Sequence, residues 1–248
     1  MAVEVIATIP GERPGEHALR FADAHSGCFV LICTPRSHPE LWQQFMDGAL
    51  RSYQRFGVEE VLAYDSVVDG LSTSAFVVAL DETGKVVAGT RVQGPYQHVD
   101  EAHAVTEWAG HPGELALRRV IADRIPEGVV EFKSAWIDHK SEHRGALRNA
   151  LARTTIHIPQ AIGVRYALST AADTVAEGWR VSGGTVAWWI PSVPYPNDQY
   201  ATVALWWDMR TYERFAVESQ LPLIEAEQAE LAAQRVSAWN RAAGLAQA

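Results

Sequence analysis

The sequence contains no apolar run approaching the ~20 residues that a membrane-spanning helix needs, so we expect no membrane span. Its start, MAVEVIATIPGERPGEH, lacks a basic segment followed by an apolar one, which argues against a signal peptide. Positive charge is scarce, because 21 Lys and Arg stand against 30 Asp and Glu, a net charge of −9. An acidic surface repels nucleic acid and anionic lipid, so a cytoplasmic protein that does not bind nucleic acid is favoured.

Cysteine is nearly absent as well. The two cysteines, Cys28 and Cys33, lie in the segment CFVLIC, which is typical of a buried strand. Because strand residues alternate between faces, these two side chains point to opposite sides and no disulfide is expected between them. No His or Cys spacing is typical of a metal site, and we predict no metal.

Apolar side chains, in contrast, are plentiful. They make up 48% of the 248 residues, enough to build the core of one large domain. Nine residues are tryptophan, and four of these form the doublets Trp188–Trp189 and Trp206–Trp207. If both doublets lie on strands, each strand directs one indole to each face of the sheet.

Hydrophobic periodicity predicts an alternation of strands and helices. In chain order we expect a polar lead-in (1–27), a strand (28–33), a helix (39–57), a β-hairpin (74–80 and 85–92, turning at Gly84), short helical pieces (95–127), a strand (129–137), a helix (142–163), a strand (164–169), a short helix (174–179), two strands (186–190 and 200–207) and a helical extension (209–248). In the extension, one stripe holds Ile224, Leu231, Ala238 and Trp239, which indicates a packing helix or a homodimer contact.

This order of elements resembles the GNAT superfamily of N-acyltransferases over residues 28–208. The details are most similar to acyl-homoserine lactone synthases and N-acyl amino acid synthases. The segments that carry the resemblance are Tyr64-Asp65 with Asp69, Gly89-Thr90-Arg91, and Glu131-Phe132-Lys133-Ser134, where the family pattern is Glu-x-Ser-Arg. The resemblance implies a mixed α/β fold in which a twisted sheet of six to seven strands has helices on both faces.

The strand at 129–137 carries the candidate catalytic residues. Alternation places Glu131 and Lys133 on one face, and Phe132, Ser134 and Trp136 on the other. Arg91 lies near the end of the neighbouring strand and would complete a cluster with Glu131 and Lys133. A charged cluster is costly to bury unless its members are paired. One interpretation is that Glu131 deprotonates an attacking amine while Arg91 and Lys133 orient an acidic acceptor; the other is a structural ion pair.

The segment 139–149 is the junction between that strand and the following helix. In the superfamily this turn and the helix N-terminus hold the pyrophosphate of coenzyme A, since free N–H groups attract phosphate. The resemblance therefore assigns donor binding to Trp136, Ile137, His143, Arg144, Gly145, Ala146 and Arg148. Leu147 and Asn149 stand where the family has glycines, and their side chains would crowd a pyrophosphate.

That departure favours a carrier protein, whose phosphopantetheine has a single phosphodiester. Charge favours it too, because residues 133–155 hold five basic residues (Lys133, Lys140, Arg144, Arg148 and Arg153) against two acidic ones (Asp138 and Glu142), a local +3. Acyl carrier proteins are acidic, and complementary charge steers docking.

The predicted function is transfer of a medium or long acyl group from acyl-CoA or an acyl carrier protein to a small amine or amino acid. Phe132, Trp188 and Trp206 are predicted to line the acyl and acceptor pocket, since broad apolar rings bury an acyl chain at ~0.8 kcal/mol per CH₂. For any single tryptophan, packing in the core is the alternative. Two alternatives stay open. One is an acetyl-CoA-dependent acetyltransferase of small molecules, and the other is a catalytically silent GNAT-like module for binding or dimerisation.

Overall fold

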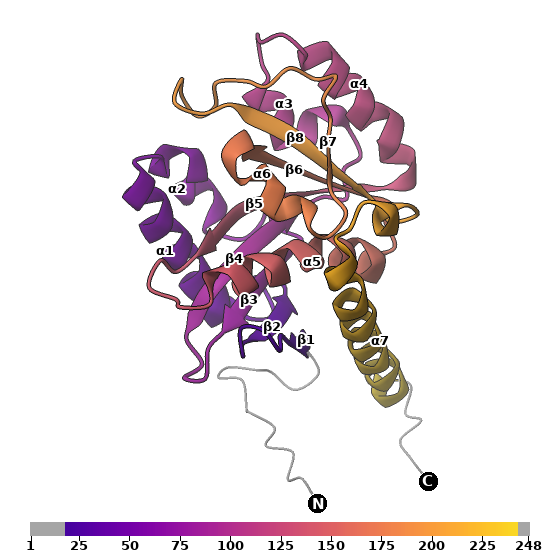
Figure 1. Ribbon diagram of the computed structural model, residues 1–248. Coiled ribbons are helices and arrows are strands. Elements are labelled where there is room, and N and C mark those ends of the chain that lie inside the picture. The colour runs from indigo at the N-terminus through magenta and orange to yellow at the C-terminus, as the bar shows by residue number, and fades with distance from the viewer. Residues whose placement is uncertain (1–17, 243–248) are drawn as a thin grey trace, which may run out of the picture.

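The computed structural model describes residues 18–242, and the side chains of residues 18–235. One eight-stranded sheet forms the centre of the molecule, and helices cover both of its faces (Figure 1). The strands are β1 (Leu19–Ala22), β2 (Phe29–Cys33), β3 (Ala75–Leu80), β4 (Val86–Gln93), β5 (Val129–Ile137), β6 (Tyr166–Ala172), β7 (Thr185–Val186) and β8 (Thr202–Asp208). The helices are α1 (Pro39–Phe56), α2 (Tyr64–Val67), α3 (His103–Glu107), α4 (Glu114–Arg124), α5 (Arg144–Ile162), α6 (Asp173–Arg180) and α7 (Leu221–Ala242).

The strand order in the sheet is β1-β2-β3-β4-β5-β6-β8-β7. Strands β5 and β6 pair in parallel, while the other neighbouring strands pair antiparallel. The predicted mixed sheet with helices on both faces is confirmed. Eight strands replace the predicted six to seven, because residues 19–22, assigned to a polar lead-in, form β1 and pair with β2. Residues 1–17 of the lead-in lie outside the described residues.

Helix α1 covers one face of the first half of the sheet. Pro39 stands in its first turn, where a missing N–H costs nothing, and Gly57 ends it with a φ of +66° that glycine adopts without strain. Its apolar stripe, including Trp42, Phe45 and Met46, packs on β2–β5. Helices α3 and α4 cover the same face further along, over β5, β6 and β8.

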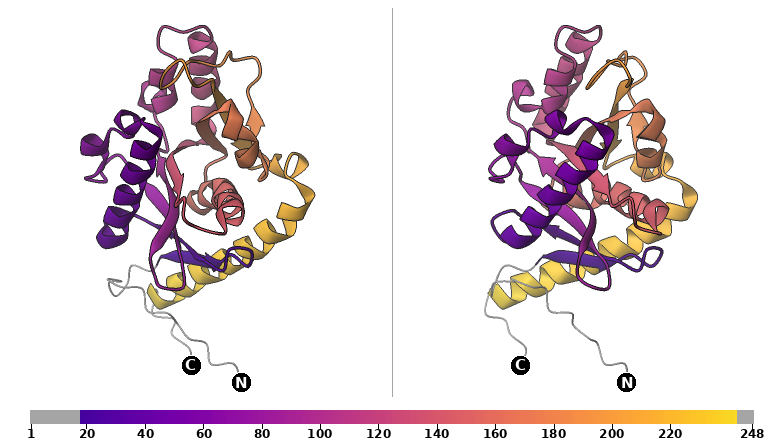
Figure 2. Two further views of the ribbon diagram at one scale, coloured as in Figure 1. Left: turned by 60° about the vertical axis from the view of Figure 1, so that its left-hand side comes forward. Right: turned by 90° about the vertical axis from the view of Figure 1, so that its left-hand side faces the viewer.

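Helices α5, α6 and α7 cover the opposite face. Leu147, Leu151 and Ile156 of α5 pack on β3–β6, and α6 lies beside α5 against β6 and β8. Helix α7 follows β8 in the chain but packs on β1, at the far edge of the sheet, and on α5 (Figure 2). The predicted stripe is confirmed at Ile224 and Leu231, which are buried. The side chains of Ala238 and Trp239 lie outside the described ones.

Buried ions join α7 to the rest of the domain. Arg153 of α5 donates to Asp23, which follows β1, to Gln220, which precedes α7, and to Glu227 of α7. Glu227 also forms a hydrogen bond with His157. We call these five residues the Arg153 network. Each side chain in it is buried. Arg153 is therefore a structural cation, and the surface of α5 presents less positive charge than its sequence suggests.

A β-bulge interrupts β5 at Ser134. Arg91 pairs with Lys133, and Gly89 pairs with Trp136, so two residues of β5 stand opposite Thr90. Ser134 has a φ of +54°, as a bulged residue can. The extra residue reverses the alternation: Phe132 packs toward α5, whereas Trp136 packs toward α1. The prediction that Phe132 and Trp136 share a face is wrong for this reason, while Glu131 and Lys133 do share one.

The predicted strand at 186–190 ends after Val186. Ile190 N–H donates to the carbonyl of Ala187, which closes a turn, and Pro191 has no N–H to continue a ladder. Trp188 and Trp189 consequently project from this turn and are 75% and 62% exposed. The assignment of both indoles to a strand is wrong. Among the described helices, none combines the length and the apolar character that crossing a membrane requires.

Candidate active site

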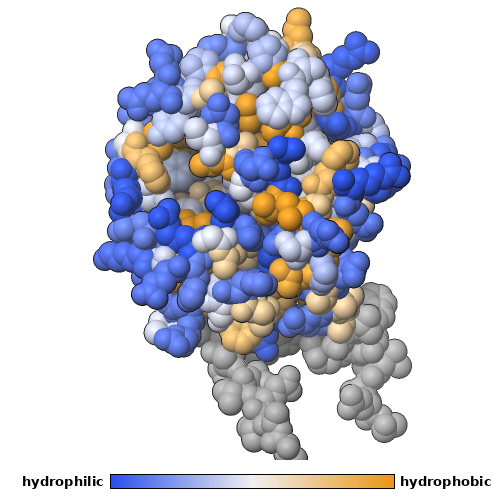
Figure 3. All heavy atoms as spheres, viewed as in Figure 1, coloured by the Kyte–Doolittle hydropathy of each residue, from blue (hydrophilic) through white to orange (hydrophobic). Residues whose placement is uncertain are grey.

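The sheet divides where β5 and β6 separate. Their parallel ladder covers four residue pairs, from Val129 with Tyr166 to Phe132 with Ser169, after which the strands diverge. A cavity of about 1310 Å³ lies at this division and reaches both faces of the sheet. The molecule is hollowed there, beside α1 and α2, in the view of Figure 3.

The cavity wall is apolar on one side and positively charged at the rim. Phe132, Leu151 and Trp179 give it an apolar side between β5, α5 and α6. Its rim carries cations from two regions that are distant in sequence: Arg51 and Arg55 of α1, and Lys140, Arg144 and Arg148 of the β5–α5 loop and α5. In a chain of net charge −9 this concentration of positive charge favours an anionic ligand.

The N-terminus of α5 stands at this rim. His143 is its N-cap residue and makes no side-chain capping bond, so the first N–H groups of the helix have no side-chain acceptor from the cap. Leu147 is fully buried in the core beneath the helix. The predicted crowding of a pyrophosphate by Leu147 is therefore wrong, because its side chain points away from the helix terminus.

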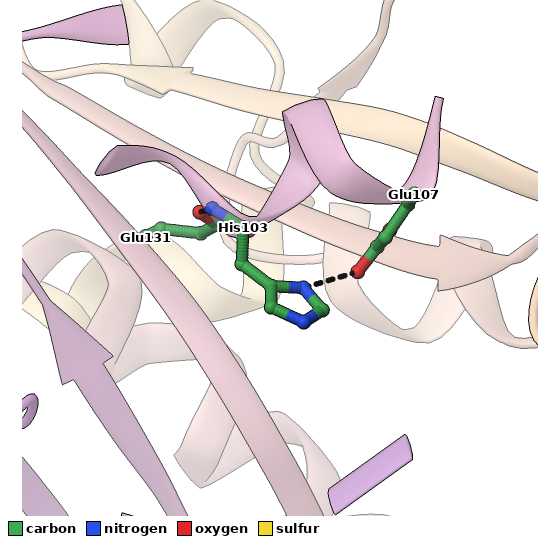
Figure 4. Close-up of side chains that lie close together, drawn as sticks. All are labelled: His103, Glu107 and Glu131. Carbon is green, nitrogen blue, oxygen red and sulfur yellow. Dashed lines mark hydrogen bonds and ion pairs between the residues drawn. The ribbon is translucent and has the colours of Figure 1, made fainter. Parts of the chain in front are cut away.

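A cluster of ions and polar groups lies between α3 and β5. Glu107 contacts the ammonium of Lys133 and accepts hydrogen bonds from Thr170 Oγ1 and His103 Nδ1, each at 3.0 Å. Lys133 Nζ is also 3.7 Å from Glu131 Oε1. We call these five residues the Glu107 cluster; Figure 4 shows three of them. His103, Glu107, Lys133 and Thr170 line the cavity.

Charge in this cluster is fixed by mutual pairing. Burial alone would raise the pKa of Glu107, but the Lys133 ammonium and the hydrogen bond from His103 lower it to about 2. Burial alone would lower the pKa of Lys133, but the charges of Glu107 and Glu131 raise it instead. Glu107 is thus a carboxylate and Lys133 an ammonium at neutral pH.

Glu131 has a different environment from the one predicted. Its Oε2 accepts hydrogen bonds from Tyr96 OH at 2.7 Å and His103 N–H at 2.8 Å, and its Oε1 accepts one from Ala104 N–H at 3.1 Å. It thereby satisfies the first two backbone N–H groups of α3. The side chain is fully buried and is not part of the cavity wall. Its catalytic role stays a prediction that this geometry does not favour.

Arg91 is buried in the wall of the cavity and forms no ion pair with a carboxylate of the described side chains. Its Nε donates to Ser134 Oγ at 3.1 Å, and its Nη1 lies 3.5 Å from Thr73 Oγ1. Among the described side chains, no carboxylate lies within ion-pairing distance of it. Burial lowers the pKa of Arg91, yet a guanidinium stays charged in proteins. An unpaired buried cation beside a cavity is costly unless an anion joins it.

The structure brings together part of the predicted site. Arg91, Phe132, Lys133, Trp136, Ile137, Arg144 and Arg148 line the cavity, whereas Glu131, His143, Gly145, Ala146, Trp188 and Trp206 do not. His143, Gly145 and Ala146 flank a lining residue at the start of α5. Trp206 is buried in a separate core, where the Arg124 guanidinium lies 4.0 Å above its ring. Trp188 is on the exposed turn after β7, so the wall does not include it.

Sequence reasoning missed His103 and Glu107. They lie in the segment described only as short helical pieces, and their signal is the i, i+4 spacing that places both on one side of a helix. These two side chains and Glu131 each offer an atom within 4.8 Å of the others, as a metal site would. The ammonium of Lys133 already contacts both carboxylates and takes the position of a cation.

The comparisons with known proteins define the fold first. FeeM, an N-acyl amino acid synthase from uncultured soil microbes, is similar with a TM-score of 0.56 and 12% sequence identity, over 77% of this chain and 95% of that one. A protein assigned as an arylalkylamine N-acetyltransferase of the mosquito Aedes aegypti has a TM-score of 0.52 and 12% identity, over 78% and 94%. The fold is that of the GNAT superfamily, as the sequence predicted.

Sequence comparison then gives the family. Uncharacterized proteins of Mycobacterium tuberculosis and Mycobacterium bovis are 41% identical to this chain over 204 residues, which are 82% of this chain and 78% of theirs. The chain belongs to the same family as these mycobacterial proteins. No family model matches the sequence.

Proposed function

We propose that this protein is an N-acyltransferase that moves an acyl group from a phosphopantetheine thioester to a small amine or amino acid. The observation that carries the proposal is the cavity at the division of β5 and β6, which joins a cationic rim to an apolar wall and a polar cluster. A thioester bound along this division has its phosphate at the rim and its carbonyl beside the bulge of β5. There a backbone N–H of residues 132–136 polarises the carbonyl.

The donor is recognised through its phosphate and its apolar chain. Lys140, Arg144 and Arg148 are exposed on one side of the cavity mouth, and Arg51 and Arg55 are exposed on the other. Of the basic residues counted in the sequence, Lys133 and Arg153 are paired internally and do not contribute to this rim. Phe132, Leu151 and Trp179 offer apolar surface for a medium or long acyl chain.

The acceptor carries a carboxylate in addition to its amine. Arg91 supplies the positive charge that binds this carboxylate, because its guanidinium lines the cavity and no carboxylate of the described side chains lies within ion-pairing distance of it. Lys133 stands opposite Arg91 in the β4–β5 ladder, so the carboxylate lies close to the Glu107 cluster. An amino acid therefore fits the cavity better than a simple amine.

The test is thiol release with a long-chain acyl carrier protein, a long-chain acyl-CoA and acetyl-CoA in parallel, each with a panel of amino acids. We expect release with a long-chain donor and slower release with acetyl-CoA. Preference for acetyl-CoA would overturn the long-chain assignment, and comparison of the two long-chain arms identifies the carrier. Absence of turnover with every donor and acceptor would favour a silent binding module.

The acceptor assignment has its own test. Replacing Arg91 by Met should lower kcat/KM for an amino acid roughly 10- to 100-fold, since a hydrogen bond to a charged group contributes about 1.5–3 kcal/mol. For the corresponding amine, which has no carboxylate, the same substitution should lower kcat/KM much less. The control is Arg55→Met at the exposed rim, which should leave the ratio of the two acceptors unchanged. An unchanged ratio in Arg91→Met would remove the carboxylate from the proposal.

A further inference from the structure

The imidazole of His103 combines a fixed orientation with a free nitrogen. His103 is the first residue of α3, and its Nδ1 lies 3.0 Å from Glu107 Oε1. Its side chain is 29% exposed and lines the cavity. Its Nε2 has no hydrogen-bond partner among the described residues. In Figure 4 the ring hangs below α3 with Nδ1 toward Glu107 and the second nitrogen turned away from it.

Glu107 determines which nitrogen carries the proton. It is a buried carboxylate, held by Lys133 and by Thr170 Oγ1 as well as by the imidazole. An ionised carboxylate can only accept a hydrogen bond, so the neutral imidazole places its proton on Nδ1. The lone pair of the ring is then on Nε2. This is the arrangement that an acid partner imposes on histidine bases in general.

Glu131, the base predicted from the sequence, lacks such a free atom. Its oxygens accept three hydrogen bonds and face the Lys133 ammonium, and it is sealed beneath α3. A general base must come within hydrogen-bond reach of the proton it removes. Of these two groups, only His103 forms part of the cavity wall.

We propose that His103 is the general base of the acyl transfer, with Nε2 as the atom that accepts the proton of the acceptor amine. The proposal rests on the proposed function. The amine nitrogen attacks the thioester carbonyl and gives one proton to Nε2 as the C–N bond forms. The C–S bond then breaks, and the leaving thiolate takes that proton, so an amine and a thioester yield an amide and a thiol. Glu107 is a positioning residue, because it acts through the imidazole.

The first test is kinetic. His103→Asn should lower kcat about 10²- to 10⁴-fold, the usual contribution of a general base, while the KM of the donor changes little. Added imidazole should restore part of the turnover to His103→Gly. The matched control is His111→Asn, because His111 is exposed just after α3 and is not part of the cavity wall. Full turnover in His103→Asn, or absence of rescue in a folded His103→Gly, would overturn the proposal.

The second test does not depend on turnover. In ¹⁵N NMR spectra of histidine-labelled protein, the neutral form of the His103 ring should carry its proton on Nδ1 and not on Nε2, and Glu107→Gln should weaken that preference. A neutral ring that carries its proton on Nε2 in the wild type would overturn the assignment. A wild type that shows the expected tautomer but releases no thiol would contradict the proposed function and leave the orientation of His103 established.

Discussion

Two groups of buried ions lie on opposite faces of the sheet. In the Arg153 network, Nε, Nη1 and Nη2 of the guanidinium each donate to an oxygen of Asp23, Gln220 or Glu227. Each group also contains one buried atom without a hydrogen-bond partner within residues 18–235, His157 Nδ1 in the Arg153 network and Glu107 Oε2 in the Glu107 cluster. Both groups are charged and buried, but only the second lines the cavity. Burial of charge alone therefore does not distinguish a structural group from a candidate catalytic one, whereas contact with the cavity does.

The sharpest contrast is expected from Arg153→Met. The substitution leaves Asp23 and Glu227 buried without their cation, which should cost about 3–5 kcal/mol of unfolding free energy. Chemical denaturation measures this loss, and turnover per folded molecule should not change. Arg119→Met is the control, since the Arg119 side chain is 83% exposed and should shift stability by less than about 0.5 kcal/mol. A comparable loss in both variants would contradict the structural role of the network.

Acid should weaken the Glu107 cluster selectively. The pKa of Glu107 is lowered from 4.5 to about 2, so its stabilising contribution is complete above pH 4.5 and is lost as the pH falls toward 2. The full contribution is on the order of 3 kcal/mol. Unfolding free energies of the wild type and Glu107→Gln, measured across this range, should therefore converge at low pH. A constant difference between them would show that Glu107 titrates normally.

A smaller loss is expected from Glu131→Gln. The amide keeps one acceptor oxygen but presents NH₂ to donors now bonded to the carboxylate, at a cost of about 2 kcal/mol. Because Glu131 orients the start of α3, turnover should fall only as far as His103 is displaced. Hydrogen exchange at the amides of His103 and Ala104 measures that displacement. If turnover were lost while hydrogen exchange at these two amides stayed unchanged, Glu131 and not His103 would be the catalytic base.

The smallest effect should come from Thr170→Val. It removes the hydroxyl that bonds Glu107 Oε1 at 3.0 Å without changing shape, and should cost about 1 kcal/mol. Thr174→Val is the control, because Thr174 is exposed on α6 and also lines the cavity. Urea midpoints measure both variants. Equal midpoints would indicate that the Glu107–Lys133 pair holds its geometry without Thr170.

The sequence was sufficient to predict most of the fold, since strand and helix periodicities are local. It could not reveal the bulge at Ser134, because a bulge depends on how two strands pair and not on one strand's pattern. It also gave no indication of β1, a four-residue strand whose order depends on its neighbour β2. The pattern around Trp188 and Trp189 predicted a strand. The turn that exposes them depends on a backbone hydrogen bond from Ile190 to Ala187, just before Pro191.

The site was predicted in part for a related reason. Arg91, Phe132 and Lys133 lie on strands that the sequence periodicity predicted, and the cavity includes all three. His103 and Glu107 come from a five-residue helix, where one i, i+4 pair is too little to establish a periodic pattern. The Arg153 network joins residues 130 positions apart, Asp23 and Arg153, and no local pattern connects them.

The path of α7 has a mechanical consequence. In the sheet, the half that contains β1–β5 and the half that contains β6–β8 are joined by only four residue pairs between β5 and β6. Helix α7 begins beside the second half, after β8, and packs on β1 of the first half, where Glu227 forms an ion pair with Arg153. Helix α7 therefore connects the two halves of the sheet by a route outside the cavity, because none of its described residues lines the cavity wall.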